Sequence, residues 1–316
     1  MERLDTSGLE RYESLFVAPH GDDVLLACPA RLQAEAEKGR RVLVLALFEP
    51  VGPDTSAARS ARSLGVDYVA AGLPAARDRG ESSAAPSLER WSAEGDVAIE
   101  AARLLSELVP RTQAIHIFAP LGLAASADHL LGYEACVRAF ASEVGRNLFL
   151  YEERPEAFVP GAVRTRLALL GARLPPAAQR VAEPASLWRH LLAVTEPRRL
   201  RGEAARLGER LAAIGAARRR FRQARPWNPQ RAFGPRLQPV VHVADEDAMR
   251  RACAIVEALL PTDRRGRPRR AQRFNARAAV AARKLGGVYH AERFWLFLPS
   301  GDGLPEIQHP LEMTRL

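Results

Sequence analysis

The sequence has few cysteines and no long apolar run, and each shortage excludes a class of protein. Only Cys28, Cys136 and Cys253 occur among its 316 residues, and their wide spacing excludes a disulfide scaffold and a CxxC zinc knuckle. No apolar run approaches the ~18 residues of a membrane-spanning helix. Residues 1–5 show neither an apolar h-region nor a cleavage signature. We therefore expect no transmembrane segment, no secretory peptide and a cytoplasmic location.

Several common functional motifs are also missing. There is no GxGxxG after a predicted strand, no Walker phosphate loop and no GxSxG elbow, so nucleotide-cofactor and serine-hydrolase functions lack support. The apolar fraction of 47% is that of a globular protein and excludes disorder of the whole chain. The length allows one large domain or two ordinary ones.

Positive charge is concentrated in one part of the chain. The formal net charge is +9, and Lys38 and Lys284 are the only lysines among 46 basic residues. Residues 198–284 hold 23 basic and 7 acidic residues, a net charge of +16. Such a stretch attracts anions, although solvated arginine-rich helices give the same count. No zinc-finger, basic-zipper or RNA-binding motif accompanies it, so we do not expect nucleic acid as a partner.

The first half of the chain alternates strands with helices. We predict strands at 14–18, 42–48, 68–71, 115–119 and 148–151, and helices at 24–38, 56–64, 97–108 and 128–143. A continuous apolar run of strand length is typical of a parallel strand covered on both faces. The alternation predicts a doubly wound α/β sheet, whose ligand site lies at the carboxyl ends of the strands.

After residue 155 the pattern changes to helical segments rich in alanine, leucine and arginine. We predict helices at 162–174, 185–195, 198–225 and 247–260, a basic loop at 262–270, and strands at 240–243, 287–290 and 294–298. The last strands are expected to rejoin the sheet. The predicted organisation is a core over 1–160, a helical excursion over 161–235 and a C-terminal segment over 236–316 that rejoins the core.

A polar turn, Ala18-Pro19-His20-Gly21-Asp22-Asp23, directly follows the first predicted strand. His20 and Asp23 are three residues apart, so both can reach one ion, while Asp22 stays free for proton transfer. A catalytic zinc needs about three nitrogen or oxygen ligands and an open position for water, with a carboxylate beside it as base. The alternative is that the two aspartates only cap the next helix and favour its dipole.

A second polar pair, Asp128-His129, opens a helix after the strand at 115–119 and the loop at 120–123. His129 can supply a third metal ligand, and Asp128 can orient another group. Two such clusters at equivalent edges of one sheet favour a ligand site over coincidence.

These motifs, in this order, resemble the zinc-dependent N-deacetylases of the LmbE/PIG-L type. The matching segments are Phe16-Val17-Ala18-Pro19-His20-Gly21-Asp22-Asp23-Val24, Pro120-Leu121-Gly122 before Asp128-His129, Tyr151-Glu152-Glu153-Arg154-Pro155 and Ala291-Glu292-Arg293-Phe294-Trp295. The resemblance covers 14–155 and returns at about 285–297. It implies a Rossmann-like, mostly parallel sheet with helices on both faces. It also implies removal of an N-acetyl group from an amino-sugar substrate, either a small molecule or a glycoconjugate.

The resemblance also implies residue roles. His20, Asp23 and His129 would bind zinc, although other divalent ions accept the same ligands. Asp22 would be the general base for the attacking water, and Asp128 would orient a neighbouring catalytic group. The oligomeric state does not follow from the sequence.

Substrate contacts are implied at Arg79 and Ser126, and here the chain departs from the family. Ser126 stands where relatives have a histidine that stabilises the oxyanion, and losing one such donor costs roughly 10²–10³ in rate. Cys28-Pro29-Ala30 stands where relatives have two glycines. Two functions therefore stay open: an active N-deacetylase, or a weakened or repurposed relative, with or without the metal, that binds a ligand or partner. A basic binding module for nucleic acid or anionic surfaces is a third.

Overall fold

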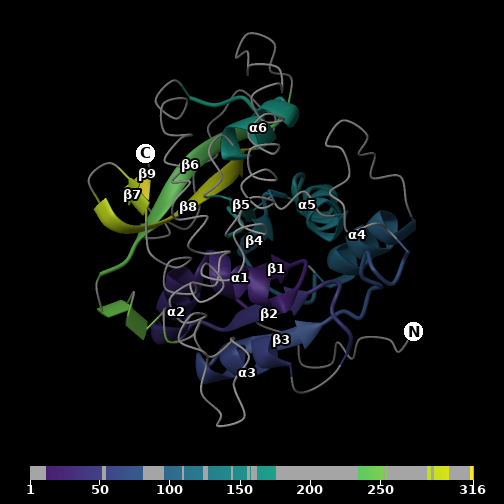
Figure 1. Ribbon diagram of the computed structural model, residues 1–316, viewed down its shortest axis with the longest axis horizontal. Coiled ribbons are helices and arrows are strands. Elements are labelled where there is room, and N and C mark those ends of the chain that lie inside the picture. The colour runs from purple at the N-terminus through teal and green to yellow at the C-terminus, as the bar shows by residue number, and fades with distance from the viewer. Residues whose placement is uncertain are drawn as a thin grey trace, which may run out of the picture.

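One mixed sheet organises the computed structural model (Figure 1). The structure describes residues 12–51, 55–80, 96–108, 110–123, 127–143, 145–154, 157, 162–175, 234–245, 247–248, 250–251, 254, 283–285, 288–298 and 314–315. Within them the strands are β1 (Ser14–Ala18), β2 (Val42–Ala46), β3 (Asp67–Ala70), β4 (His116–Pro120), β5 (Asn147–Tyr151), β6 (Arg236–Val243), β7 (Arg283–Leu285), β8 (Val288–Leu298) and β9 (Thr314–Arg315). The helices are α1 (Gly21–Ala27), α2 (Pro29–Glu37), α3 (Ser56–Ser63), α4 (Asp96–Leu108), α5 (Ala127–Phe140) and α6 (Ala162–Leu169).

The first five strands form a parallel sheet in the order β3-β2-β1-β4-β5. Ser14 of β1 pairs with Val42 of β2 on one side and with His116 of β4 on the other. The chain therefore reverses its direction of strand addition between β1 and β4. In doubly wound folds the crevice at the carboxyl ends of two such strands is the place where ligands bind.

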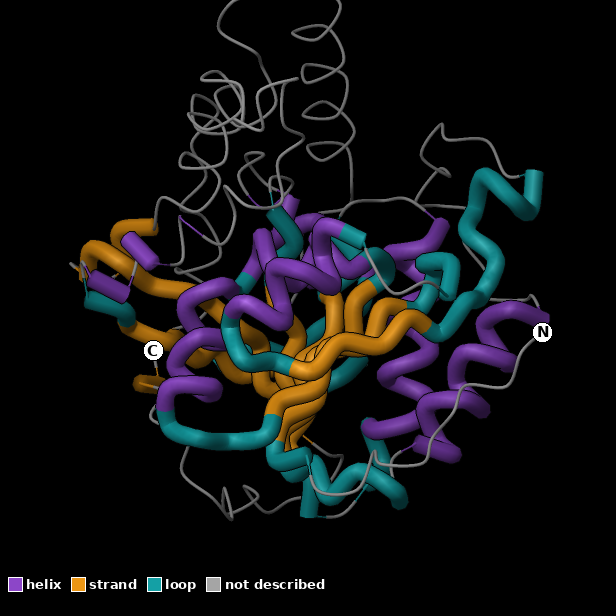
Figure 2. Tube along the Cα trace, turned by 90° about the horizontal axis from the view of Figure 1, so that it is seen from below, coloured by secondary structure: helices purple, strands orange, loops and turns teal. Residues whose placement is uncertain are grey.

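Helices cover both faces of this parallel sheet (Figure 2). Alternate residues of each strand enter different apolar clusters, because successive side chains of a strand point to opposite faces. Leu15 and Val17 pack with residues of α4 and α5, whereas Phe16 and Ala18 pack with residues of α1, α2 and α3. All five residues of β1 are buried. The predicted α/β fold with helices on both faces is confirmed.

One predicted helix, 24–38, is wrong in its extent. It begins earlier, at Gly21, and it is broken into α1 and α2 at Cys28. Pro29 is the first residue of α2, a position at which its missing N–H costs nothing. The free amides of Ala30 and Arg31 donate to Glu292 of β8, both at 2.8 Å. A carboxylate from the far end of the chain thus caps a helix that the break leaves open.

The second half of the chain adds antiparallel strands beyond β5. β8 pairs with β5 and with β6, so the predicted return of the last strands to the sheet is confirmed. The predicted helix at 162–174 ends at Leu169, and Arg173 instead forms a bridge with Arg236. The predicted helices at 185–195 and 198–225, the loop at 262–270 and most of the basic stretch lie outside the described residues. The boundaries at 160 and 235 stay predictions.

No helix in the described part of the chain combines the length and the apolar character that a membrane crossing requires.

Glu292 gives the fold a testable pH dependence. Burial raises the pKa of Glu292 from 4.5 to about 7. The charge of Arg154 and the hydrogen bonds from the backbone amides of Ala30 and Arg31 oppose this rise but do not cancel it. The folded protein therefore keeps a proton that the unfolded chain has lost, and the stability contributed by this group falls as the pH rises through that interval. Urea denaturation should show the wild type losing stability relative to Glu292→Gln between about pH 5 and about pH 7. A difference between the two proteins that is constant with pH would contradict this.

Candidate functional site

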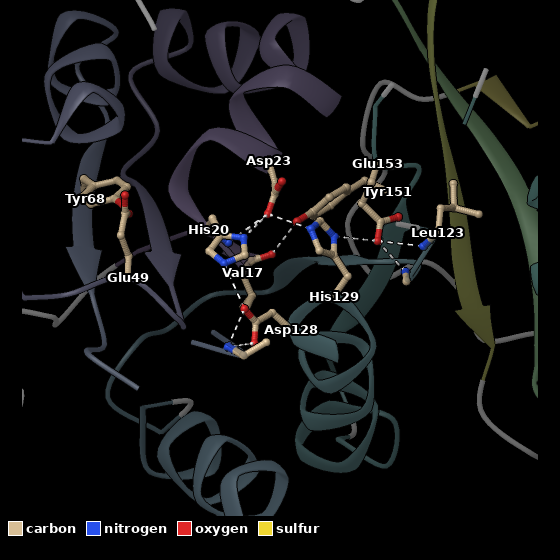
Figure 3. A network of polar contacts seen from close by, with 12 residues as sticks. Val17, His20, Asp23, Glu49, Tyr68, Leu123, Asp128, His129, Tyr151 and Glu153 are labelled. Carbon is tan, nitrogen blue, oxygen red and sulfur yellow. Dashed lines mark hydrogen bonds and ion pairs between the residues drawn. The ribbon is translucent and has the colours of Figure 1, made fainter. Parts of the chain in front are cut away.

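The two polar turns meet at the carboxyl ends of β1 and β4, the neighbouring strands at which the direction of strand addition reverses (Figure 3). His20 ends the turn after β1 as the N-cap of α1, with extended backbone angles of φ −124° and ψ 153°. His129 lies in the first turn of α5, shortly after β4. Because β1 and β4 are neighbours, their carboxyl ends bring these segments together although more than a hundred residues separate them in sequence.

His20, Asp23 and His129 form the centre of the site. One potential ligand atom from each lies within 4.8 Å of the others, as a shared metal ion would require. Asp23 Oδ2 is 3.4 Å from His20 Nδ1 and 3.5 Å from His129 Nε2. The same oxygen accepts the backbone N–H of His20 at 2.9 Å, so Asp23 also caps α1. Capping and proximity to two imidazoles are therefore combined in one carboxylate.

Each imidazole also has a carboxylate beside its other ring nitrogen. His20 Nε2 lies 3.1 Å from Asp128 Oδ2, and His129 Nδ1 lies 3.4 Å from Glu153 Oε1. Both carboxylates are almost completely buried. Histidines that bind metals commonly place their second N–H on a carboxylate, which fixes the tautomer and makes the other nitrogen more basic. The donor set and its orientation fit a divalent metal.

Asp128 is held from two further directions. Its Oδ1 accepts the backbone N–H of Ala76 at 2.9 Å and lies 3.0 Å from Arg79 Nη1. Arg79 also donates to the carbonyl of Pro74 at 2.6 Å. Asp128, predicted to orient a neighbouring group, thus contacts His20, and Arg79, predicted as a substrate contact, reaches the site through Asp128.

Charges within this cluster perturb one another. Burial alone would lower the pKa of His20, but its hydrogen bonds to Asp128 and Asp23 raise the pKa to about 10. Burial alone would raise the pKa of Asp23, but the charges of His129 and His20 hold it below its usual value. Without a metal, the centre is therefore a carboxylate compensated by protonated imidazole. A metal ion would replace that proton, as ligand deprotonation generally accompanies metal binding.

Asp22 lies beside this centre with part of its surface exposed. Partial desolvation, followed by repulsion from Asp23, raises its pKa, and the positive charges of His20 and His129 oppose that rise. A carboxyl with a raised pKa next to a candidate metal site is a candidate for proton transfer.

Two carboxylates of the site were not among the predicted site residues. Glu153 follows β5, and Glu49 follows β2 and contacts the hydroxyl of Tyr68. Both lie within three residues of the carboxyl end of a parallel strand. This position in the sequence was the signal from which they could have been predicted as site residues. Burial, followed by the charge of Asp22, raises the pKa of Glu49.

The structure describes one of the two departures from the family pattern that the sequence predicts, Cys28, and not the other, Ser126. Ser126 lies outside the described residues, so its role stays a prediction. Cys28 is fully buried, and burial followed by the charge of Glu292 raises its thiol pKa well above 9.0. This excludes a reactive thiolate at that position.

No protein-family profile and no curated protein sequence matches this chain. Among solved structures, the zinc-inhibited form of teicoplanin deacetylase Orf2 is similar, with a TM-score of 0.51 and 13% identity over 93% of this chain and 100% of that one. A deacetylase–teicoplanin complex from teicoplanin biosynthesis has a TM-score of 0.51 and 14% identity over 92% of this chain and 100% of that one. At identities this low, the structural similarity shows a shared fold and does not show a shared function.

Gly21 allows the polar turn to pass close to β3. A Cβ at this position would clash with the hydroxyl oxygen of Tyr68 and would lie 2.8 Å from the Cβ of Ala57. Gly21→Ala should therefore lower the free energy of unfolding by about 1–3 kcal/mol, as overpacking does. Gly132→Ala is the control, because its nearest contact, Pro120 Cγ, is at 3.3 Å. Equal stability of the two variants in urea would contradict the requirement for glycine at 21.

Proposed function

We propose that this protein is a metal-dependent hydrolase that removes an N-acetyl or related acyl group from an amino-sugar-containing substrate. The observation that supports it most directly is the convergence of His20, Asp23 and His129, with a carboxylate behind each imidazole, at the carboxyl ends of β1 and β4. Proteins of similar fold include two structures described as teicoplanin deacetylases.

His20 Nδ1, Asp23 Oδ2 and His129 Nε2 are the atoms that would hold the ion. Two imidazole nitrogens and one carboxylate oxygen suit zinc, and three protein ligands leave a position open for water or substrate. Other divalent ions accept the same donors. When bound, such an ion polarises the substrate carbonyl and lowers the pKa of water to near neutrality.

Asp22 is the proposed general base. Its carboxylate would take a proton from the attacking water and return it to the departing amine nitrogen. Asp128 would hold the His20 ring in orientation through Nε2, and Arg79 would hold Asp128 in turn. Arg79 is also a candidate contact for a polar group of the substrate, since its side chain keeps 11% of its surface exposed beside the site.

The substrate class rests on the family resemblance and on the similar structures. The similar structure of a deacetylase in complex with teicoplanin places that compound among the candidates, along with N-acetylglucosaminyl compounds. By the family resemblance, Ser126 stands at the position of the oxyanion histidine and would offer a shorter, neutral side chain to the substrate. We therefore expect a substrate or rate that differs from those of relatives with histidine there.

The test combines metal content with acetate release after loading with zinc. The wild type is assayed on N-acetylglucosaminyl compounds and on teicoplanin, beside Asp22→Asn and Asp23→Asn. Asp22→Asn should keep stoichiometric zinc and lose about 10²–10⁴ in rate, the contribution of a general base. Asp23→Asn should lose both zinc and activity, because it removes the central ligand.

Glu107→Gln, on the exposed side of α4, controls for loss of a carboxylate outside the site. Zinc binding without acyl release from any compound would favour the repurposed relative. Absence of zinc from the wild type would overturn the ligand assignment and the mechanism that depends on it.

A further inference from the structure

The loop at 121–123, between β4 and α5, is held by two buried charged side chains of opposite sign. Glu153 Oε1 accepts the backbone N–H of Gly122 at 2.7 Å and that of Leu123 at 3.0 Å (Figure 3). Arg166 Nε donates to the carbonyl of Leu121 at 2.9 Å. Two consecutive peptide groups of the loop are therefore bound, by Glu153 just after β5 and by Arg166 of α6.

The same Glu153 oxygen lies 3.4 Å from His129 Nδ1. One carboxylate oxygen therefore contacts both the loop that leads towards α5 and an imidazole in the first turn of α5. A displacement of Glu153 would change the loop and the orientation of His129 together.

Arg166 is held close to the same elements. Its guanidinium lies over the ring of Tyr133, one helical turn after His129 on α5, with 4.6 Å from the guanidinium carbon to the ring centroid. Gly122 has a positive φ of 78°, and a Cβ there would lie 2.8 Å from Arg166 Nη2. Glycine at 122 thus satisfies both the backbone conformation and the approach of the guanidinium.

Burying the charged side chains of Glu153 and Arg166 lowers the stability of the fold unless hydrogen bonds replace their lost hydration. Glu153 is 1% exposed and Arg166 is 6% exposed. Burial lowers the pKa of Arg166, and its interactions with Tyr133 and Glu153 oppose that change. Within the described residues, Glu153 Oε2 and Arg166 Nη2 have no hydrogen-bond partner. Unsatisfied buried charged groups lower stability. Stability alone therefore does not explain why these two side chains are buried here.

We propose that Glu153 and Arg166 are positioning residues that fix the ring of His129 and the loop in front of it. Glu153 orients His129 Nδ1 directly, and Arg166 acts through Leu121 and Tyr133. Since Arg166 belongs to α6, the first helix after the parallel core, this contact connects the second half of the chain to the site. The inference deepens the proposed function, because His129 is one of its proposed metal ligands.

Glu153→Gln separates this role from a structural one. The amide oxygen of glutamine can still accept the N–H groups of Gly122 and Leu123, so the loop should stay folded while the charge beside His129 is lost. Glu152→Gln is the matched control, because the adjacent carboxylate is also buried but accepts from Trp295 Nε1 at 3.0 Å, away from the site. For Arg166→Met the control is Arg31→Met, since Arg31 is also buried and pairs with Glu35.

The first measurement uses the metal-free protein. Side-chain ¹⁵N–¹H correlation spectra, with His129 assigned by a His129→Gln variant, should show shifted His129 ring nitrogens in Glu153→Gln and Arg166→Met. The spectra of Glu152→Gln and Arg31→Met should keep the wild-type His129 signals. The second measurement is zinc affinity by chelator competition, which should fall by about 10–100-fold in Glu153→Gln, as for other carboxylates behind a metal-binding histidine.

Unchanged His129 signals in both site variants would overturn the inference, whatever happens to stability. If the His129 signals shift in Glu153→Gln and Arg166→Met but the wild type binds no zinc, the positioning role is supported and the proposed metal-dependent function is refuted. The two proposals therefore fail on different observations.

Discussion

The site depends on one mostly buried carboxylate, that of Asp23. The groups around it have to balance its negative charge. Its side chain is 15% exposed, and a single oxygen receives the N–H of His20 and lies beside two imidazoles. Removing a carboxylate from water is costly unless hydrogen bonds and opposite charges replace the lost hydration. The N-terminus of α1 and the two histidines provide this compensation, which explains why the turn after β1 and the start of α5 must meet.

The compensation extends outward in alternating charges. Behind His20 is Asp128, and behind Asp128 is Arg79; behind His129 is Glu153, whose oxygen also receives two loop amides. Each negative group therefore has a positive or N–H partner on the side away from the centre. Such a preorganised arrangement needs little rearrangement when a cation replaces the proton on the imidazoles, because the ring orientations are already set.

The sequence predicted the parts of this arrangement that are local. The polar turns after two apolar strands predicted His20, Asp23 and His129 together, because the carboxyl ends of neighbouring parallel strands share one edge. The contact of Glu153 with His129 was not predicted, since strand pairing of β4 with β5 creates it and a turn pattern does not encode it. The break at Cys28 was not predicted, because the helical pattern of 24–38 continues through Pro29 and the residue that caps α2, Glu292, lies more than 250 residues away.

The pair Glu152 and Glu153 shows how the two halves of the chain are joined at the site. Because successive side chains after a strand point in opposite directions, Glu152 binds Arg293 and Trp295 of β8, while Glu153 binds the loop and His129. β8 also supplies Glu292 to the start of α2, which directly follows the helix that carries Asp23. β8 therefore supports the elements on both sides of the candidate metal centre. An intact site accordingly requires this strand as well as the parallel core, although all three proposed metal ligands precede residue 130.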